Sequence, residues 1–152
     1  MRITAKGIYA LNALLDLSCR YTGGKIVPLS EIAERRRMPL KFLEQIMLVL
    51  KKAGYVTNRR GIGGGFTLKK SPDSITIGEI IRLVDGEFDI FPREGGQAWN
   101  HPSGRYEEIA IQEMRRDVVS AIEGVVNSIT LADIMHRADE LRAENTGYMY
   151  EI

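Results

Sequence analysis

Hydrophobic positions at helical spacing predict three helices in the first third of the chain. The first covers about residues 4–18, the second about 29–36 and the third about 39–53. The second helix is expected to stop before Pro39, because a proline disfavours helical geometry in the residue before it and is tolerated in a first helical turn. The apolar stripes expected to face the core are Ile8, Leu11, Leu15 and Cys19 in the first helix and Leu43, Ile46, Met47 and Leu50 in the third.

Between about residues 55 and 70 the hydrophobic period changes from helical to alternating, which predicts two short strands. Val56 alternates with Asn58 on one side, and Phe66 alternates with Leu68 on the other. Four glycines lie between the strands, within residues 61–65. The segment is therefore predicted to be a β-hairpin with a glycine tip.

A capping box predicts where the fourth helix begins. Thr76 is followed three residues later by Glu79, so the two side chains can satisfy amides that lack partners at a helix start. This helix should end near residues 85–86. The next segment, 86–105, contains prolines and glycines without a sustained period and is predicted to be one long loop, a feature that is usually functional or disordered.

The C-terminal part is predicted to hold two more helices. The first runs from about 106 to 129 and carries an apolar face broader than one domain needs. Thr130 and Asp133 then repeat the capping pattern and open a last helix to about residue 142. The prediction is a mainly α fold with a small β-hairpin, divided into 1–85, 86–105 and 106–152.

Composition is typical of one compact domain in the cytoplasm. A chain of 152 residues that is 44% hydrophobic can build a core without disulfides, and its single cysteine cannot form one internally. Arg2 and Lys6 precede an apolar stretch as in an export signal, but Asn12 and Asp16 interrupt it, which favours a core helix. No other segment approaches the length of a membrane span.

Charge is divided sharply along the chain. Residues 1–70 hold 14 Lys or Arg and 4 Asp or Glu, a net +10, whereas residues 71–152 hold 7 and 16, a net −9. A basic half attracts polyanions such as nucleic acid, and an acidic half tends to stay away from them. On charge alone, an ordinary solvated surface is an equal alternative.

The order of elements indicates what the basic half of the chain binds. Two helices joined by a short turn and followed by a glycine-tipped hairpin form a winged helix-turn-helix, in which the second helix enters the major groove of DNA. Its buried stripe leaves Lys41, Glu44 and Gln45 outward near the helix start. Lysine can donate to guanine, glutamate can accept from cytosine, and glutamine can bridge an adenine edge.

The hairpin would be the wing. A narrow tip at Gly63 and Gly64 lets the backbone approach the duplex, while Arg59 and Arg60 reach phosphate or the minor groove. The remaining basic residues of this half are expected to contact phosphate or add to the general field; they are Arg35, Arg36, Arg37, Lys51 and Lys52.

Two alternatives for the glycine run are an ordinary turn and a phosphate-binding loop for a nucleotide. A Walker loop needs Gly-Lys-Ser/Thr followed by a helix, whereas Phe66-Thr67-Leu68 follows here with the pattern of a strand. The chain has two histidines and one cysteine, without a nucleophile and base pattern. An enzyme is therefore not expected.

Six segments together resemble the Rrf2 family of winged helix-turn-helix transcriptional regulators. The resemblance implies a homodimer on an imperfect palindromic operator, with DNA contacts at Pro39, Lys41, Glu44 and Arg60. It also implies a dimer seam along the long C-terminal helix, where the apolar positions are Val118, Ile122, Val125, Val126 and Ile129. The segments are Met1-Arg2-Ile3-Thr4-x-Lys6-Gly7-x-Tyr9-Ala10, Leu43-Glu44-Gln45, Gly54-x-Val56, Arg60-Gly61-x-Gly63-Gly64-Gly65-Phe66, Thr76-Ile77-Gly78-Glu79-Ile80-Ile81 and Asn127-Ser128-Ile129-Thr130-Leu131-Ala132-Asp133.

The chain departs from the cluster-binding members of that family. Those members carry three cysteines in the loop before the long helix, and residues 86–105 contain none. Because an iron–sulfur cluster is held mainly by thiolates, no cluster is expected. Cys19 lies on the predicted apolar stripe, which favours a buried thiol over a redox sensor.

The sequence does not identify the effector or the protein partner of such a regulator. The loop holds Asp89, Glu94, Trp99 and His101, which match no metal template, so a solvated loop is favoured over a metal or effector site. His136 is expected to join a salt-bridged helix face. The alternative to an operator-binding regulator acting alone is one controlled mainly by a protein partner, such as a metabolic enzyme.

Overall fold

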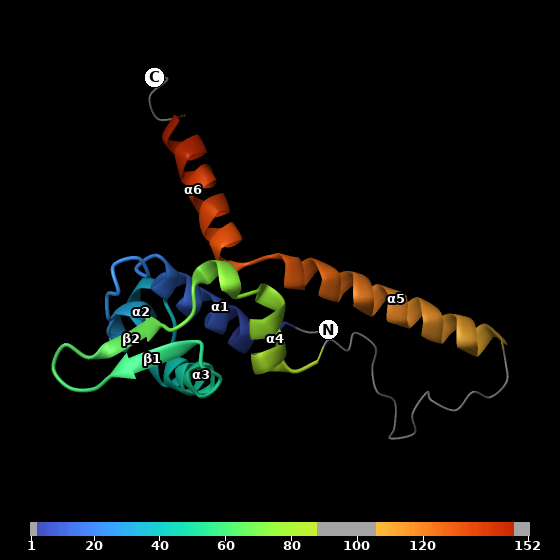
Figure 1. The fold of residues 1–152 in the computed structure, drawn as a ribbon, viewed down its shortest axis with the longest axis horizontal. Coiled ribbons are helices and arrows are strands. Elements are labelled where there is room, and N and C mark those ends of the chain that lie inside the picture. The colour runs from blue at the N-terminus through green and yellow to red at the C-terminus, as the bar shows by residue number, and fades with distance from the viewer. Residues whose placement is uncertain (1–2, 88–105, 148–152) are drawn as a thin grey trace.

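The computed structural model describes residues 3–87 and 106–147, and its element order matches the prediction (Figure 1). The fold is mainly α with one two-stranded antiparallel hairpin. None of the described helices is both long and apolar enough to span a bilayer. The elements are α1 (Ala5–Ser18), α2 (Leu29–Arg35), α3 (Leu40–Lys52), β1 (Val56–Arg59), β2 (Gly65–Leu68), the short 3₁₀ helix η1 (Pro72–Ser74), α4 (Ile77–Asp85), α5 (Tyr106–Ser128) and α6 (Leu131–Gly147).

Helix α1 is central to the core, but its most deeply buried face differs from the predicted stripe, of which Leu11 and Leu15 pack partly against the core. Ile8 is 45% exposed and Cys19 is also exposed, so the prediction of a buried thiol is wrong. The predicted stripe followed the largest apolar side chains, whereas α1 is contacted by α3, α4, α6 and β2 and approaches them through small residues. The buried residues of α1 include Ala10, Ala13, Leu14 and Leu17, which share one face at helical spacing.

The hairpin has the predicted register. Val56 pairs with Leu68 at its base, and Arg59 pairs with Gly65 next to its tip. A contact that was not predicted adds to the base: Val27 and Phe66 exchange two backbone hydrogen bonds of 2.8 Å each. The segment before α2 therefore holds the hairpin against the helical body.

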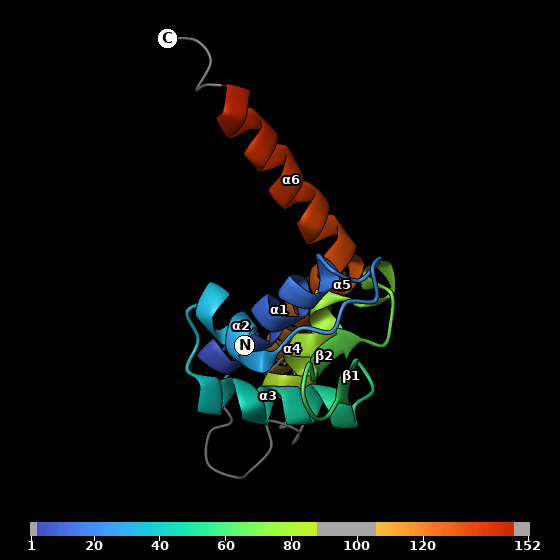
Figure 2. The same ribbon diagram turned by 90° about the vertical axis from the view of Figure 1, so that its left-hand side faces the viewer.

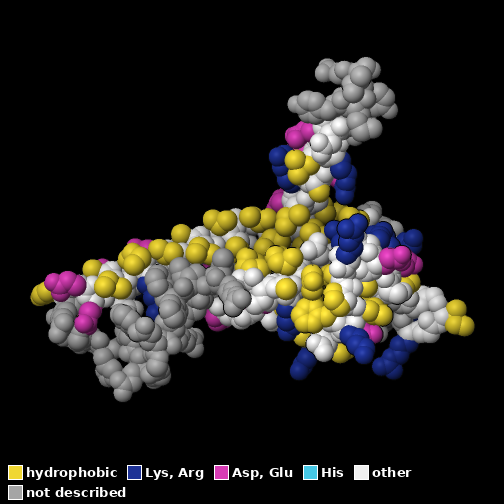
Figure 3. All heavy atoms as spheres, turned by 180° about the vertical axis from the view of Figure 1, so that it is seen from behind, with side chains coloured by type: hydrophobic (Ala, Val, Ile, Leu, Met, Phe, Trp, Pro, Cys, Tyr) yellow, Lys and Arg dark blue, Asp and Glu magenta, His cyan; other side chains and the backbone are white. Residues whose placement is uncertain are grey.

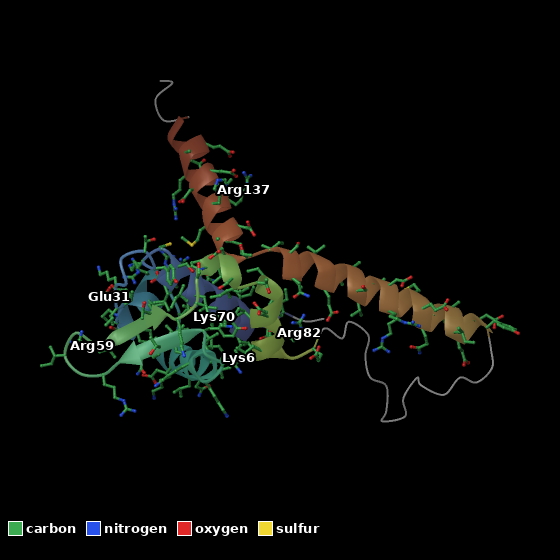
Figure 4. All side chains as sticks on the ribbon, in the orientation of Figure 1. Lys6, Glu31, Arg59, Lys70, Arg82 and Arg137 are labelled. Atoms are coloured by element: carbon green, nitrogen blue, oxygen red, sulfur yellow. The ribbon has the colours of Figure 1, made fainter. Side chains whose placement is uncertain are left out.

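Helix α4 connects the N-terminal elements to α5. At its far end the carboxylate of Asp85 accepts hydrogen bonds from the backbone amide and the hydroxyl of Thr4, at 2.9 and 2.6 Å. On its other side Arg82 donates to the side-chain oxygen of Asn127 at 3.2 Å, and Figure 4 shows this arginine between α4 and α5. The last turn of α4 is thus joined to the start of α1 and to α5 by polar contacts between residues far apart in sequence.

The last two helices extend away from this body in different directions (Figures 1 and 2). Near the body, Val119, Ile122 and Val126 of α5 pack against the core, and Leu131 at the start of α6 is fully buried. Helix α6 is five residues longer than predicted, and an ion pair between Arg137 and Glu144 of 3.8 Å spans two of its turns.

Candidate nucleic-acid interface

Helix α3 buries one face and exposes a mixed polar face, as predicted. Its predicted core stripe is fully buried. On the opposite side Lys41, Glu44 and Gln45 are exposed, and Leu48 continues the same row with 65% of its surface exposed. This outer face offers a cationic donor, a carboxylate acceptor, an amide and an apolar contact within about two helical turns.

The turn that leads into α3 is tight and contains an unusual backbone angle. Arg37 has a φ of +51°, which places a residue with a side chain in the left-handed region. The next residue, Met38, is buried, and its amide donates to the carbonyl of Ala33 at 2.8 Å. Pro39 then occupies the position before the helix, and no side chain in the described part of the chain caps α3. The amide of Phe42 donates to the carbonyl of Pro39 at 3.1 Å, so the amides of Leu40 and Lys41 are the ones open to an acceptor from outside.

A buried carboxylate fixes the position of α2, the first helix of the pair. Asp16 of α1 is only 3% exposed, and Arg35 of α2 donates to both of its oxygens, at 3.0 and 2.8 Å. Arg20 donates to the same carboxylate at 3.2 Å, and Arg36 lies 3.5 Å from it. The paired acids hold the Arg35 guanidinium in its charged form and raise its pKa, the bond to Asp16 most strongly.

These contacts change the interpretation of the arginine cluster that ends α2. Arg35 was predicted to contact phosphate or to add to the general field, but its three nitrogens donate to Asp16 and Glu31 within the chain. Its guanidinium is therefore already paired within the chain, and a phosphate contact by Arg35 stays a prediction. Arg37, the last of the three consecutive arginines, is exposed at the surface that precedes α3.

The hairpin presents two arginines beside a rigid tip. Arg59 ends β1 and Arg60 follows it, and both are exposed. The amide of Gly64 donates to the carbonyl of Gly61 at 2.9 Å, which closes a four-residue turn with Gly63 at a φ of +73°. A β-carbon on Gly64 would overlap the carbonyl oxygens of Arg59 and Gly61, so the tip needs glycine there. The result is a narrow tip of backbone that directly follows two exposed arginines.

The outer face of α3 and the hairpin lie on the same side of the body. In Figures 1 and 2 both occupy the lower part of the molecule, while α6 points the opposite way. Figure 3 shows lysine and arginine side chains projecting from this edge. A helix that can enter a major groove and a narrow basic hairpin that can reach the backbone or the adjacent minor groove are the two parts a winged helix-turn-helix uses on duplex DNA.

Three residues of this region were not singled out from the sequence. Leu48 could have been found by continuing the outward row of α3 one turn past Glu44, and Ile62 could have been found as the only bulky residue among the glycines of the tip. Asp16 interrupts an apolar stretch of the sequence, and the i,i+4 spacing to Arg20 could have indicated that pair. Its other partners, Arg35 and Arg36, lie at the end of α2, and no local pattern identifies them.

The residues predicted to form the dimer seam on α5 fall into two groups. Ile122 and Val126 are half-buried against the core of their own chain, whereas Val118, Val125 and Ile129 are exposed. The exposed residues continue toward the start of the helix, and none of the described residues of α5 is buried. We call these exposed residues the α5 stripe; they are Ile111, Met114, Val118 and Val125 of α5, and Ile129 directly after it. Figure 3 shows a continuous hydrophobic band along α5 up to its junction with α6.

Metal-ligand candidates have little support in the described part of the chain. His136 lies 3.3 Å from Glu140 on the exposed side of α6, which is the salt-bridged face that was predicted. Within residues 3–87 and 106–147, no group of three His, Cys, Asp or Glu side chains is arranged to hold a metal ion. The candidates Asp89, Glu94, Trp99 and His101 lie outside the described residues.

Comparison with known proteins identifies the family of this fold. The profile of the Rrf2 family, described as an iron-dependent transcriptional regulator, matches residues 3–137. The chain is 33% identical to the HTH-type transcriptional regulator IscR of Klebsiella pneumoniae (strain 342), over 99% of this chain and 90% of that protein. It is 36% identical to IscR of Serratia proteamaculans (strain 568), over 93% and 83% of the two chains.

Solved structures agree with the sequence comparison. The structure of T. potens IscR matches with a TM-score of 0.71 and 33% identity, covering 93% of this chain and 90% of that one. CymR, the global cysteine regulator of B. subtilis, matches with a TM-score of 0.72 and 29% identity, covering 88% and 95%. These matches extend over the helix-turn-helix, the hairpin and the long C-terminal helices alike, and the chain belongs to the Rrf2 family of DNA-binding transcriptional regulators.

Proposed function

We propose that this protein is a sequence-specific repressor that binds a palindromic operator as a homodimer in the cytoplasm. The observation that carries the proposal is the juxtaposition of the exposed polar face of α3 with the exposed arginines of the hairpin. In this arrangement α3 enters the major groove, and the hairpin reaches the adjacent backbone and minor groove. A bound repressor would block access of the transcription machinery to the operator.

Each predicted contact residue has a distinct task in this proposal. Lys41, Glu44 and Gln45 read base edges from the first turns of α3, and Leu48 contacts a thymine methyl group. Pro39 stands directly before the helix at the groove, and the open amides that follow it are directed at phosphate. The hairpin contributes Arg59 and Arg60 as contacts to phosphate or the minor groove, and Gly63 and Gly64 let its backbone approach the duplex.

Dimerisation would come from the α5 stripe. Apart from its contact with α4, this 23-residue helix leaves large hydrophobic side chains in water along most of its length. Helices in water usually derive their stability from packing of an apolar face, and within residues 3–87 and 106–147 nothing covers this stripe. A second copy of α5 supplies that packing, and the resulting two-fold axis places two α3 helices on half-sites about 34 Å apart.

The donor set of the chain does not fit an iron–sulfur cluster, although the family profile is described as iron-dependent. The chain has one cysteine, Cys19, and it lies at the end of α1, whereas clusters are held mainly by several thiolates. We therefore propose that the regulator works without a cluster and without enzymatic activity, with a small molecule or protein as its effector. Purified protein should be colourless, and bound iron at one cluster per subunit would contradict this.

Operator selection tests the main proposal. Purified protein should enrich one palindromic motif from random duplexes, and its affinity should fall by about 10³ to 10⁵ between 50 and 200 mM salt if the dimer neutralises about six to ten phosphates. Failure to enrich any motif would contradict the proposal. Arg60→Ala should weaken binding to all sequences, whereas Lys41→Ala and Glu44→Ala should alter base preference.

A matched control removes one positive charge away from the interface. Arg137 lies on α6, on the opposite side of the molecule from α3 (Figure 4). Arg137→Ala should leave operator affinity within about twofold of the wild type. Salt screens the attraction between an exposed charge and the DNA when the two are more than about 10 Å apart. Equal losses for Arg60→Ala and Arg137→Ala would show that only the overall charge matters and would contradict a role for the hairpin.

A further inference from the structure

The tip of the hairpin carries a large hydrophobic side chain that the proposed contacts do not use. Ile62 has a relative exposure of 105%, so its whole surface is in water. Figure 3 shows a small group of hydrophobic atoms at the outer end of the hairpin, separate from the hydrophobic band on α5. Within the described residues, Ile62 therefore contributes no burial to the fold, and its apolar surface is available to a partner.

The turn fixes the direction of this side chain. Ile62 is the second residue of the turn that the hydrogen bond from Gly64 to Gly61 closes, and a positive φ at Gly63 follows it. This arrangement is that of a type II turn, in which the second residue lies at the outer corner. Because the strands are paired up to Arg59 and Gly65, the corner is carried on a short, hydrogen-bonded support. The apolar group is thus presented at the most distant point of the hairpin.

Its neighbours indicate which surface it meets. Arg59 and Arg60 precede the corner and are both exposed, so the apolar group approaches any partner together with two positive charges. A duplex groove offers the matching combination, with phosphates on both walls and apolar deoxyribose edges and stacked bases between them. A purely apolar protein pocket would have to desolvate the two guanidinium groups instead.

We propose that Ile62 is a wedge that enters the minor groove beside the recognition site and partly unstacks one base step. This inference rests on the proposed operator binding and adds a second source of specificity to it. Partial unstacking is least unfavourable at pyrimidine–purine steps such as TA and CA, because these steps are the most flexible. The protein would therefore prefer such a step opposite the hairpin.

The wedge is tested with Ile62→Ala and with the conservative Ile62→Leu on the selected operator. Ile62→Ala should weaken operator binding by about tenfold, equivalent to about 1.4 kcal/mol. It should also lose the preference for a flexible step over an AA step at the position opposite the hairpin. Ile62→Leu should stay within about threefold of the wild type and keep that preference. The salt dependence should be the same in all three proteins, because an isoleucine neutralises no phosphate.

A spectroscopic readout separates a wedge from a simple surface contact. An operator with 2-aminopurine at the flexible step should become more fluorescent when wild-type protein binds, since unstacking relieves quenching, and should change little with Ile62→Ala. Equal affinity, equal step preference and equal fluorescence for wild type and Ile62→Ala would overturn the wedge while the operator binding itself stands. A wild-type protein that selects no operator would overturn both.

Discussion

Thr76 and Thr130 lie opposite each other in an isolated antiparallel bridge, and each stands at the start of a helix. The amide of Ile77 donates to the carbonyl of Ile129 at 2.9 Å, and the amide of Leu131 donates to the carbonyl of Ile75 at 3.0 Å. Each threonine also forms a reciprocal capping box with the acidic residue three positions later. The bridge therefore joins the start of α4 to the junction of α5 and α6, and it holds the proposed dimerisation helices at a fixed place on the DNA-binding unit.

The first prediction concerns the close approach of α4 and α5 beside this bridge. A β-carbon on Gly78 would overlap the side chain of Asn127 and press on Val126, whereas one on Gly124, in α5, would meet nothing. Gly78→Ala should lower the free energy of unfolding by about 1–3 kcal/mol, as overpacking does. Gly124→Ala should be neutral or stabilise by up to about 1 kcal/mol, since alanine favours a helix. Urea unfolding of both variants measures this, and equal effects would contradict the close contact.

The local signals in the sequence predicted the elements well. Capping boxes at Thr76 and Thr130, the proline before α3 and the glycine run of the hairpin each act within a few residues, so their consequences are visible in the sequence. The core face of α3 was also predictable, because one stripe of large apolar residues faces a single side. The same holds for the outward direction of Lys41, Glu44 and Gln45.

Features that depend on packing from several directions could not be predicted. Helix α1 is surrounded by other elements, so small residues such as Ala10 and Ala13 decide where it makes close contact, and the larger Ile8 stays exposed. The pairing of Asp16 with Arg35 joins two helices, and a sequence pattern does not show which charges meet. For the same reason the sequence alone does not show that Arg35 pairs within the chain.

The second prediction tests the α5 stripe as the dimer seam. Val125 is 59% exposed, and Val118 lies on the same side of the helix. The double variant Val118→Glu and Val125→Glu should be monomeric in analytical ultracentrifugation, because four charges per dimer would have to be buried in an apolar seam. It should also lose operator binding that depends on two half-sites. Circular dichroism should still show the helical spectrum of a folded protein.

Ile109 provides the control for this experiment. It is an exposed hydrophobic residue of α5 on the opposite side of the helix from Val118. Ile109→Glu should therefore leave the oligomeric state unchanged. A wild-type protein that is monomeric at micromolar concentration, or a double variant that stays dimeric, would show that the stripe is not the seam.

The third prediction is a pH dependence at the start of α6. Hydrogen bonds from the backbone and then the hydroxyl of Thr130 lower the pKa of Asp133 below its ordinary value of 3.8. A carboxyl whose pKa is lower in the folded state adds stability when it is ionised, above its ordinary value, and loses this contribution as the pH falls through the folded-state value. The stability difference between wild type and Asp133→Asn should therefore be largest at pH 5–7 and shrink below about pH 4. Urea titrations from pH 7 to 3 measure it, and a constant difference would contradict the assignment.

The fourth prediction decides between an internal and a DNA-contacting role for Arg35. Asp16→Asn removes the charged acceptor that Arg35 and Arg20 share. Removing one partner of a buried pair can reduce stability by about 3–5 kcal/mol. The arginines here are about one-third exposed and can regain water, so a smaller loss of about 1.5–3 kcal/mol is expected. Glu31→Gln removes the exposed acceptor of the same arginine and should lower stability by about 1 kcal/mol or less.

DNA binding gives the second readout for Arg35. Removing an arginine that contacts phosphate reduces the magnitude of the slope of log affinity against log salt by about 1. Because its guanidinium is held by Asp16 and Glu31, Arg35→Ala should reduce stability with little change in that slope, whereas Arg60→Ala should reduce the slope with little change in stability. If Arg35→Ala instead keeps the stability and lowers the slope, its ion pairs are exchanged for phosphate on binding, and α2 contacts the DNA directly.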